Sequence, residues 1–291
     1  MKILGTGLSG LLGTQVVDTL KQEFSFINLS LETGVDITDP KTLEKAFASS
    51  DAPWVFHFAA RTDVDIIENE KNLKVQSPAW KVNVIATESI ASLCKKTQKH
   101  MLYISTDYVF SGKKDRYTEE DIPDPESFYA MTKYEGEKCV LRLGDHGLVV
   151  RIANPYGPWE SGKKDFVHKI VDELQKGSDI KAPDDQLFVP TFIPDIASAI
   201  ERLIRENASG IYHVVGDDVC SPFQVASKIA VYLGASDAMV QKTSFASFFK
   251  GRAPRPFHAV LGNDKIKRLG LKMTSFQDGL QIIFSKRKDT V

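Results

Sequence analysis

Two pairs of side chains in this sequence could move a proton. Tyr129 and Lys133 are four residues apart, and so are Tyr134 and Lys138. On a helix, residues i and i+4 are neighbours, so each pair places a phenol beside an ammonium. A phenol has an unperturbed pKa near 10, and a nearby positive charge lowers that pKa by stabilising the phenolate. Such a pair can exchange a proton with a carbonyl oxygen while a nicotinamide cofactor exchanges hydride with its carbon.

The two tyrosines cannot both face one cleft. Five residues at about 100° each place them about 140° apart around a helix. We favour Tyr129 because it lies at the predicted start of the helix, beside the loop that carries Pro123 and Pro125, where it can reach a substrate. At least one of the two pairs is therefore a surface or core feature.

Polar side chains also follow an apolar run that predicts a buried strand. Ser105 and Thr106 end this run, and Asp107 and Tyr108 come next. The carboxyl ends of parallel strands open onto the ligand crevice, so the Thr106 hydroxyl could hold the reacting oxygen. The alternative is that Ser and Thr only end the strand by bonding to the backbone.

A glycine-rich segment lies between the first predicted strand and the first predicted helix. Gly7, Gly10 and Gly13 have the spacing GxxGxxG, not the usual GxGxxG. Such a turn lets backbone N–H groups approach a pyrophosphate at the positive end of the helix, although it also allows close helix–strand packing. Its position at the first strand–helix junction favours a dinucleotide cofactor. The predicted contacts in this turn are Gly7, Leu8, Ser9, Gly10, Leu11 and Gly13.

The second predicted strand ends without the acid that would bind the ribose hydroxyls of NAD. Residues 26–30 contain neither an acid nor an arginine. A missing acid removes repulsion against a 2′-phosphate, so we favour NADP(H) over NAD(H). Asp36, followed by Ile37, could bond to the adenine, and the alternative is an ordinary loop acid.

Alternating strands and helices must position these residues. The predicted strands are residues 2–4, 24–29, 54–59, 101–105 and 148–152, and the predicted helices are 11–20, 41–48, 78–96 and 128–143. This alternation indicates βαβ crossovers, and hence an α/β fold with a Rossmann-like, doubly wound parallel sheet.

The alternation of predicted strands and helices becomes irregular after about Asn154. We expect a dinucleotide-binding domain over residues 1–155 and a smaller C-terminal substrate-binding lobe over 156–291. Segments near 190–216, including a strand at 211–215, are expected to return to the first domain. Ser221-Pro222-Phe223-Gln224 forms a capping box that predicts the start of another helix.

The composition excludes several classes of protein. The 291 residues include 37 Lys and Arg and 38 Asp and Glu, a net charge of -1 that does not favour a nucleic-acid partner or an anionic membrane. The 3 cysteines lie far apart and the 6 histidines are scattered, so we expect neither a disulfide scaffold nor a metal site. Glycines interrupt the apolar N-terminus, and no later run approaches about 18 uncharged apolar residues. We therefore expect no signal peptide, no membrane span and a cytoplasmic location.

Taken together, these motifs resemble the extended short-chain dehydrogenase/reductases. More narrowly, the chain resembles the dTDP-4-dehydrorhamnose reductase group. The matching positions are residues 59–65, 68, 83–84, 105–110, 112, 117, 119, 121, 123, 125, 129–137, 185–186, 190–191, 195–197, 210–213 and 255–256. The resemblance covers essentially the whole chain.

The resemblance implies a role for individual residues. Catalysis falls on Thr106, Tyr129 and Lys133, which selects Tyr129 over Tyr134. The implied cofactor contacts add Asp36, Ile37, Ala59, Ala60, Ser105, Tyr129 and Lys133 to the glycine-rich turn. The implied contacts to a nucleotide-sugar substrate are Thr62, Thr106, Asp107, Tyr108, Asn154 and Arg255.

Two features depart from the reductase pattern. Residues 151–158 read RIANPYGP, where the rhamnose reductases typically carry Arg-Thr-Ser-Trp. This form looks more like the sugar-nucleotide epimerases and dehydratases, in which the asparagine contacts the nucleotide diphosphate, so the aromatic sugar contact is absent or supplied by another residue such as Trp159. The acidic cluster that some members use for magnesium at a dimer contact has no counterpart that we can map, which leaves a homodimer open.

Three hypotheses about function follow. The first is NADPH-dependent reduction of the 4-keto group of a nucleotide-linked deoxysugar. The second is an epimerase or dehydratase, which returns the hydride to its own substrate. The third is a non-catalytic, NADP-binding subunit like the regulatory β subunit of methionine adenosyltransferase, to which the chain is also similar.

Overall fold

Six parallel strands form the centre of the computed structural model, which describes residues 1–160 and 163–288. They are β1 (Lys2–Thr6), β2 (Ser25–Leu29), β3 (Trp54–His57), β4 (His100–Thr106), β5 (Gly147–Ile152) and β10 (Gly210–His213). Their spatial order is β10-β5-β4-β3-β1-β2, and every neighbouring pair is parallel. The predicted doubly wound sheet is confirmed.

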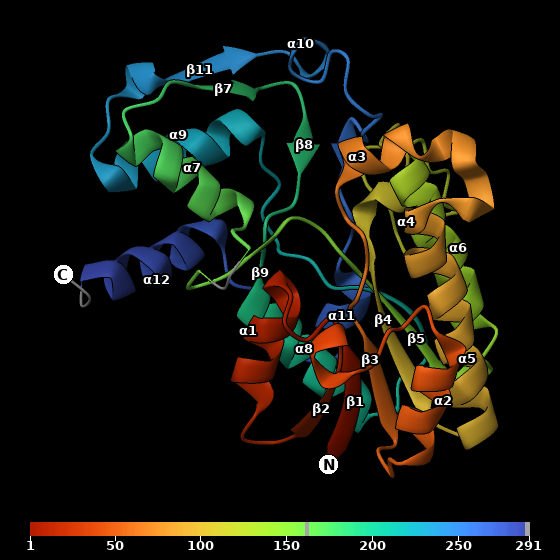
Figure 1. The fold of residues 1–291 in the computed structure, drawn as a ribbon. Coiled ribbons are helices and arrows are strands. Elements are labelled where there is room, and N and C mark those ends of the chain that lie inside the picture. The colour runs from red at the N-terminus through yellow and green to blue at the C-terminus, as the bar shows by residue number, and fades with distance from the viewer. Residues whose placement is uncertain (161–162, 289–291) are drawn as a thin grey trace.

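Side chains of each strand alternate between two helical layers, because successive residues of a strand point to opposite faces. On β4, Leu102 and Ile104 pack into one layer and Met101 and Tyr103 into the other. The first layer contains α1 (Leu11–Leu20) and α8 (Ile193–Arg205), and the second contains α2 (Pro40–Ala48), α5 (Ala86–Thr97) and α6 (Phe128–Leu141) (Figure 1). The inner strands β3, β4 and β5 are therefore buried on both faces, which explains their nearly continuous apolar sequences, whereas the edge strands β2 and β10 are only partly buried.

Helix starts agree well with the sequence signals. Helix α1 spans the predicted residues. Helix α2 begins at Pro40, and the Asp39 carboxylate accepts a hydrogen bond from the Lys41 N–H at 3.0 Å. The predicted capping box of Ser221 and Gln224 is present and starts α9 (Pro222–Leu233).

The predicted helix at 78–96 is interrupted. It consists of α4 (Pro78–Trp80), a π-helical turn (Lys81–Ile85) and α5. The turn carries the buried Asn83, whose side-chain Oδ1 accepts from the Arg61 N–H at 2.8 Å and whose Nδ2 donates to the Arg61 carbonyl at 3.0 Å. Asn83 thus holds the chain after β3. The short helix α3 (Val64–Asn69) in this connection was not predicted.

A second lobe lies above the carboxyl ends of the sheet (Figure 1). Its elements are α7 (Phe166–Gln175), β7 (Ile180–Pro183), β8 (Leu187–Phe188), α9, β11 (Val240–Thr243), α10 (Phe245–Phe248), β12 (His258–Ala259) and α12 (Phe276–Lys288). Strand β7 pairs with β11 and β8 with β12. The remaining short elements are β6 (Pro155–Tyr156), which pairs with β9 (Thr191–Phe192), and α11 (Asp264–Lys267). The strand predicted at 211–215 corresponds to β10, which spans four residues and pairs with β5 in the main sheet.

Within the described residues, no helix is long and apolar enough to cross a bilayer. The same part of the chain holds no cluster of three His, Cys, Asp or Glu side chains arranged to bind a metal ion. Cys94, Cys139 and Cys220 are buried and free.

Two buried histidines should make the fold sensitive to acid. The His57 ring lies 2.6 Å from the Thr6 hydroxyl and 2.9 Å from the Thr87 hydroxyl. Burial lowers the pKa of His57 to about 3, and burial also lowers the pKa of His213 to about 3. An unfolded histidine titrates near pH 6.5, so below that pH the unfolded state binds more protons, and stability is lost as the pH falls towards 3. Burial raises the pKa of Asp107 to about 7, which has the opposite effect and offsets one histidine.

We therefore expect the free energy of unfolding to fall by roughly 1.4 kcal/mol per pH unit between about pH 6 and pH 5. Urea titrations across this range measure the slope. In the variant His57→Asn the remaining histidine and Asp107 should balance, so the slope should nearly vanish. An identical slope in the variant and the wild type would contradict this explanation.

Candidate active site

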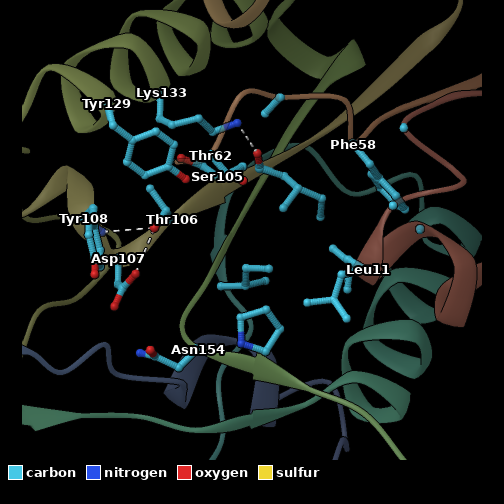
Figure 2. Close-up of a pocket in the computed structure, with 18 of the residues that line it drawn as sticks. Leu11, Phe58, Thr62, Ser105, Thr106, Asp107, Tyr108, Tyr129, Lys133 and Asn154 are labelled. Atoms are coloured by element: carbon cyan, nitrogen blue, oxygen red, sulfur yellow. Dashed lines mark hydrogen bonds between the residues drawn. The ribbon is translucent and has the colours of Figure 1, made fainter. Parts of the chain in front are cut away.

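A cavity of about 420 Å³ opens at the carboxyl ends of the central strands. Strands β1 and β3 are neighbours there, and the chain leaves them toward opposite sides of the sheet. This is the switch point at which open α/β sheets bind ligands. Figure 2 shows side chains from α6 and from the end of β4 directed into the cavity. The predicted site residues that line it are Gly7, Gly10, Leu11, Gly13, Ala60, Thr62, Ser105, Thr106, Asp107, Tyr108, Tyr129, Lys133 and Asn154.

The glycine-rich turn fits a dinucleotide. Gly7 has φ +69°, and a Cβ there would lie 2.7 Å from Ala59 Cα. A Cβ on Gly13 would lie 2.6 Å from Leu8 Cα, so the turn and the following helix pack closely only without side chains. Gly10 is the N-cap of α1, and no described side chain caps this helix. The helix start is thus shaped for an anion such as a pyrophosphate.

The helix α6 brings one of the two predicted pairs into the cavity. It begins after Ser127, whose hydroxyl caps it. Tyr129 and Lys133 lie one turn apart, are buried, and line the cavity. Tyr134 instead packs against a separate apolar cluster, with Lys138 Nζ 4.3 Å from its ring centroid. The structure thus places the first pair at the site and the second pair outside it.

The Tyr129 phenol lies in a setting that keeps it protonated. Burial raises its pKa above the ordinary value, and the charges of Asp107 and Tyr108 act in the same direction. A hydrogen bond with the Thr106 side chain acts the other way and lowers the pKa. The Tyr108 ring meets the Tyr129 ring edge-on, with centroids 6.0 Å apart. Burial therefore outweighs the lowering expected from the sequence, and the phenol is a proton donor at neutral pH.

The Lys133 ammonium is held against the sheet. It donates a hydrogen bond to the Ile104 carbonyl at 2.7 Å, drawn in Figure 2, and lies 4.0 Å from the centroid of the Tyr103 ring. Burial lowers the pKa of Lys133 to about 7, while the charge of Glu137 raises it. The position of the ammonium is thus well defined. Because its pKa lies close to neutral pH, nearby charges decide how much of the lysine is protonated there.

The end of β4 supplies hydroxyl and carboxyl groups. The Thr106 hydroxyl donates to Asp107 Oδ1 at 2.8 Å and accepts from the Tyr108 N–H at 3.2 Å (Figure 2). Thr106 therefore does end the strand, as the alternative interpretation holds, and it also faces the cavity. At this end of β4, Ser105 Oγ and Asp107 Oδ2 are two of the buried side-chain atoms that have no hydrogen-bond partner in the described part of the chain. Buried polar atoms are rarely left unpaired, so both indicate a ligand that completes the site.

A second cavity of about 240 Å³ adjoins the first and was not predicted. The two share Asp107, Tyr108 and Asn154. Asn154 has φ +40°, a strained conformation for a residue with a side chain, and it lies between the sheet and the second lobe. The other lining residues include Phe166, Ile180, Gln186, Phe188, Phe248 and Phe249. The wall is mainly apolar and includes the rings of these four phenylalanines, which suits a flat ring.

Six predicted contact residues line neither cavity: Leu8, Ser9, Asp36, Ile37, Ala59 and Arg255. The Arg255 guanidinium is paired with Asp65, with Nη2 2.7 Å from Oδ2, and lies 4.7 Å from the Phe249 ring centroid. Asp36 Oδ1 accepts a hydrogen bond from the N–H of Thr38 at 2.8 Å. These two charged side chains are therefore occupied within the protein.

Lys163, a positively charged side chain at the site, was not identified from the sequence. Lys163 lines the first cavity, and its Nζ lies 3.3 Å from the Thr62 hydroxyl. Only its basic character could have indicated it, because the loop that carries it has no regular pattern. Lys163 brings a positive charge from the second lobe to the mouth of the cavity.

Known proteins resemble this chain over nearly its whole length. The family described as the RmlD substrate binding domain matches residues 1–288. A dTDP-4-dehydrorhamnose reductase of Streptomyces griseus is 32% identical, over 92% of this chain and 88% of that protein. The crystal structure of a dTDP-4-dehydrorhamnose reductase of Bacillus anthracis in complex with NADP is 29% identical with a TM-score of 0.88, covering 98% of this chain and 99% of that one. The methionine adenosyltransferase 2 subunit beta of Xenopus laevis is 28% identical, over 96% of this chain and 86% of that protein.

Proposed function

Because the chain belongs to the family described as the RmlD substrate binding domain, we propose that it reduces the 4-keto group of a nucleotide-activated deoxysugar with NADPH, as a dTDP-4-dehydrorhamnose reductase does. One observation carries this proposal: Tyr129, Lys133 and Thr106 converge on a cavity that the glycine-rich turn bounds. The named reductase relatives of Streptomyces griseus and Bacillus anthracis support the substrate class.

The proposed reaction divides the work between cofactor and protein. A bound nicotinamide cofactor supplies the hydride that reduces the carbonyl carbon. Thr106 and Tyr129 bind the carbonyl oxygen through their hydroxyl groups. As negative charge develops on that oxygen, Tyr129 gives it a proton, and the Lys133 ammonium stabilises the phenolate that remains until solvent reprotonates it. Burial keeps the Tyr129 pKa high, so the phenol enters each cycle as an acid.

The substrate is proposed to extend from the first cavity into the second. The sugar would contact Thr62, Asp107 and Tyr108, and Asn154 would contact the diphosphate where the cavities meet. The second cavity, whose apolar wall includes four phenylalanines, would hold the base. This division supports the proposed domain boundary near residue 155, with residues 156–291 mainly a substrate-binding lobe. The region 190–216 is shared with the first domain, because its strand β10 belongs to the main sheet.

The proposed cofactor preference is NADP(H), and it should be weak. The absence of an acid at the end of β2 and the NADP in the Bacillus anthracis relative support it. Residues 28–39, however, contain no lysine or arginine to pair with a 2′-phosphate. We expect kcat/KM for NADPH to exceed that for NADH by less than about tenfold, because this segment supplies no charge-assisted bond to the 2′-phosphate. A clear preference for NADH would contradict the proposal.

Steady consumption of NADPH with a dTDP-4-keto sugar tests the function. A reductase oxidises one NADPH for each sugar reduced, whereas an epimerase or dehydratase shows no net change in nicotinamide absorbance. Sugar conversion without net loss of NADPH would overturn the proposal. A panel of nucleotide sugars that protect against thermal unfolding, with NADH or NADPH present, identifies the nucleotide.

A binding subunit is the second candidate, favoured by the similarity to the methionine adenosyltransferase 2 subunit beta. Such a protein would bind the cofactor and a partner protein without turnover. Absence of activity on every keto sugar of the panel, together with one co-purifying partner, would support it over the reductase.

A further inference from the structure

A buried ion pair lies one helical turn beyond Lys133. Both Glu137 oxygens face the Arg151 guanidinium, with Nε to Oε1 at 2.9 Å and Nη2 to Oε2 at 2.7 Å. The two side chains are 0% and 1% exposed. Such a pair loses its hydration on folding, and replacing it by apolar residues is often neutral or stabilising. Stability alone is therefore a poor explanation for placing it beside the site.

Its position on α6 connects it to the lysine. Lys133 and Glu137 are four residues apart and lie on the same face of the helix. This face packs closely on β4, because a Cβ on Gly136 would lie 2.9 Å from Tyr103 Cζ. The same Tyr103 ring lies under the Lys133 ammonium. The carboxylate and the ammonium thus share one buried face of α6, in a setting from which water is excluded.

The other titratable groups around Lys133 do not supply a negative charge. Tyr129 on the same helix and Tyr103 on β4 both have pKa values raised by burial, so both are neutral. His57 on β3 is also neutral, because burial and the charge of Lys133 lower its pKa to about 3. Among these described neighbours, Glu137 is the carboxylate whose charge reaches Lys133.

If Lys133 acts in the reduction, as proposed above, we infer that Glu137 is a positioning residue that keeps the Lys133 side chain in its ammonium form. Arg151 holds the carboxylate in place through its two hydrogen bonds. Arg151 is itself fixed, because its guanidinium carbon lies 5.0 Å from the Phe110 ring centroid and its Nη1 lies 3.4 Å from His213 Nε2. A row of three ionisable side chains thus runs from Lys133 through Glu137 to Arg151 on β5, the neighbour of the edge strand β10.

The test compares two neutralised ion pairs on α6. The double variant Glu137→Gln/Arg151→Met removes both buried charges together, so that neither is left unpaired. The control Glu135→Gln/Lys138→Met removes a partly exposed pair of the same helix, whose charges lie 2.7 Å apart. A thermal unfolding measurement first confirms that each variant is folded.

The readout is the pH dependence of Lys133 acetylation by acetic anhydride, followed by peptide mass spectrometry, because only the free amine reacts. We expect the reaction midpoint of the buried-pair variant to fall by about one pH unit, which gives about tenfold faster labelling below the midpoint. The apparent pKa at which kcat declines at high pH should be lower by the same amount. The control should match the wild type in both measurements. Glu137→Asp, which keeps a carboxylate, should keep the midpoint close to the wild-type value.

An unchanged labelling midpoint in the folded buried-pair variant would overturn the inference. A midpoint well below neutral in the wild type would overturn it without any variant. The labelling needs no substrate, so a shifted midpoint in a protein that reduces no sugar would uphold the role of Glu137 and refute the proposed function alone.

Discussion

Replacing Tyr129 by phenylalanine should reduce turnover by about 10²-fold or more, because it removes the proton donor and keeps the ring. The ring packs edge-on against Tyr108 and is buried, so the fold should not change. Cofactor affinity, measured by fluorescence titration with NADPH, should stay within about threefold of the wild type, since the glycine-rich turn is untouched. Turnover with the keto sugar is the decisive measurement.

The chain offers a matched control for this variant. Tyr134→Phe removes a phenol from the same helix at a position that packs outside the cavity. Its turnover should equal that of the wild type. An unchanged rate in Tyr129→Phe, or an equal loss in both variants, would refute the assignment of the proton donor.

Replacing Gly7 by alanine should both destabilise the fold and weaken cofactor binding. The residue adopts φ +69°, which costs an alanine about 1–2 kcal/mol. The added methyl group would also collide with the backbone of Ala59, and such crowding typically costs about 1–3 kcal/mol more. Relief of the collision moves the turn away from the pyrophosphate, so we expect the Kd for NADPH to rise by about tenfold or more.

Gly144→Ala separates the two effects. Gly144 has φ +59°, but a Cβ there meets no atom within 4 Å, and it lies in the connection between α6 and β5. This variant should lose stability through backbone strain alone and bind NADPH with unchanged affinity. If Gly7→Ala binds NADPH as tightly as Gly144→Ala does, the turn does not hold the cofactor.

Local signals explain what the sequence could predict. Helix α2 follows from Asp39 and Pro40, and α9 from the capping box at Ser221, because these residues act on the next turn of the chain. The central strands follow from apolar runs that two layers of helices must cover. Tyr129 was preferred to Tyr134 from helix geometry and the position of the helix start, and the structure places only Tyr129 at the cavity.

Long-range packing explains what the sequence could not predict. The second cavity joins segments around Phe166, Phe188 and Phe249, which no local pattern connects. The two-residue strands β8 and β12 are too short to carry a period of their own. Arg255 stays a predicted substrate contact, and its guanidinium is paired with Asp65 from a helix that was not predicted.

Transfer of deuterium from the cofactor tests the central claim most directly. NADPH that carries deuterium in the transferable position at C4 of the nicotinamide ring is incubated with a dTDP-4-keto sugar, and the product is examined by NMR and mass spectrometry. The proposed function predicts one deuterium at C4 of the product sugar for each NADPH oxidised. A product without deuterium at C4, or conversion of the sugar with no NADPH oxidised, would contradict it.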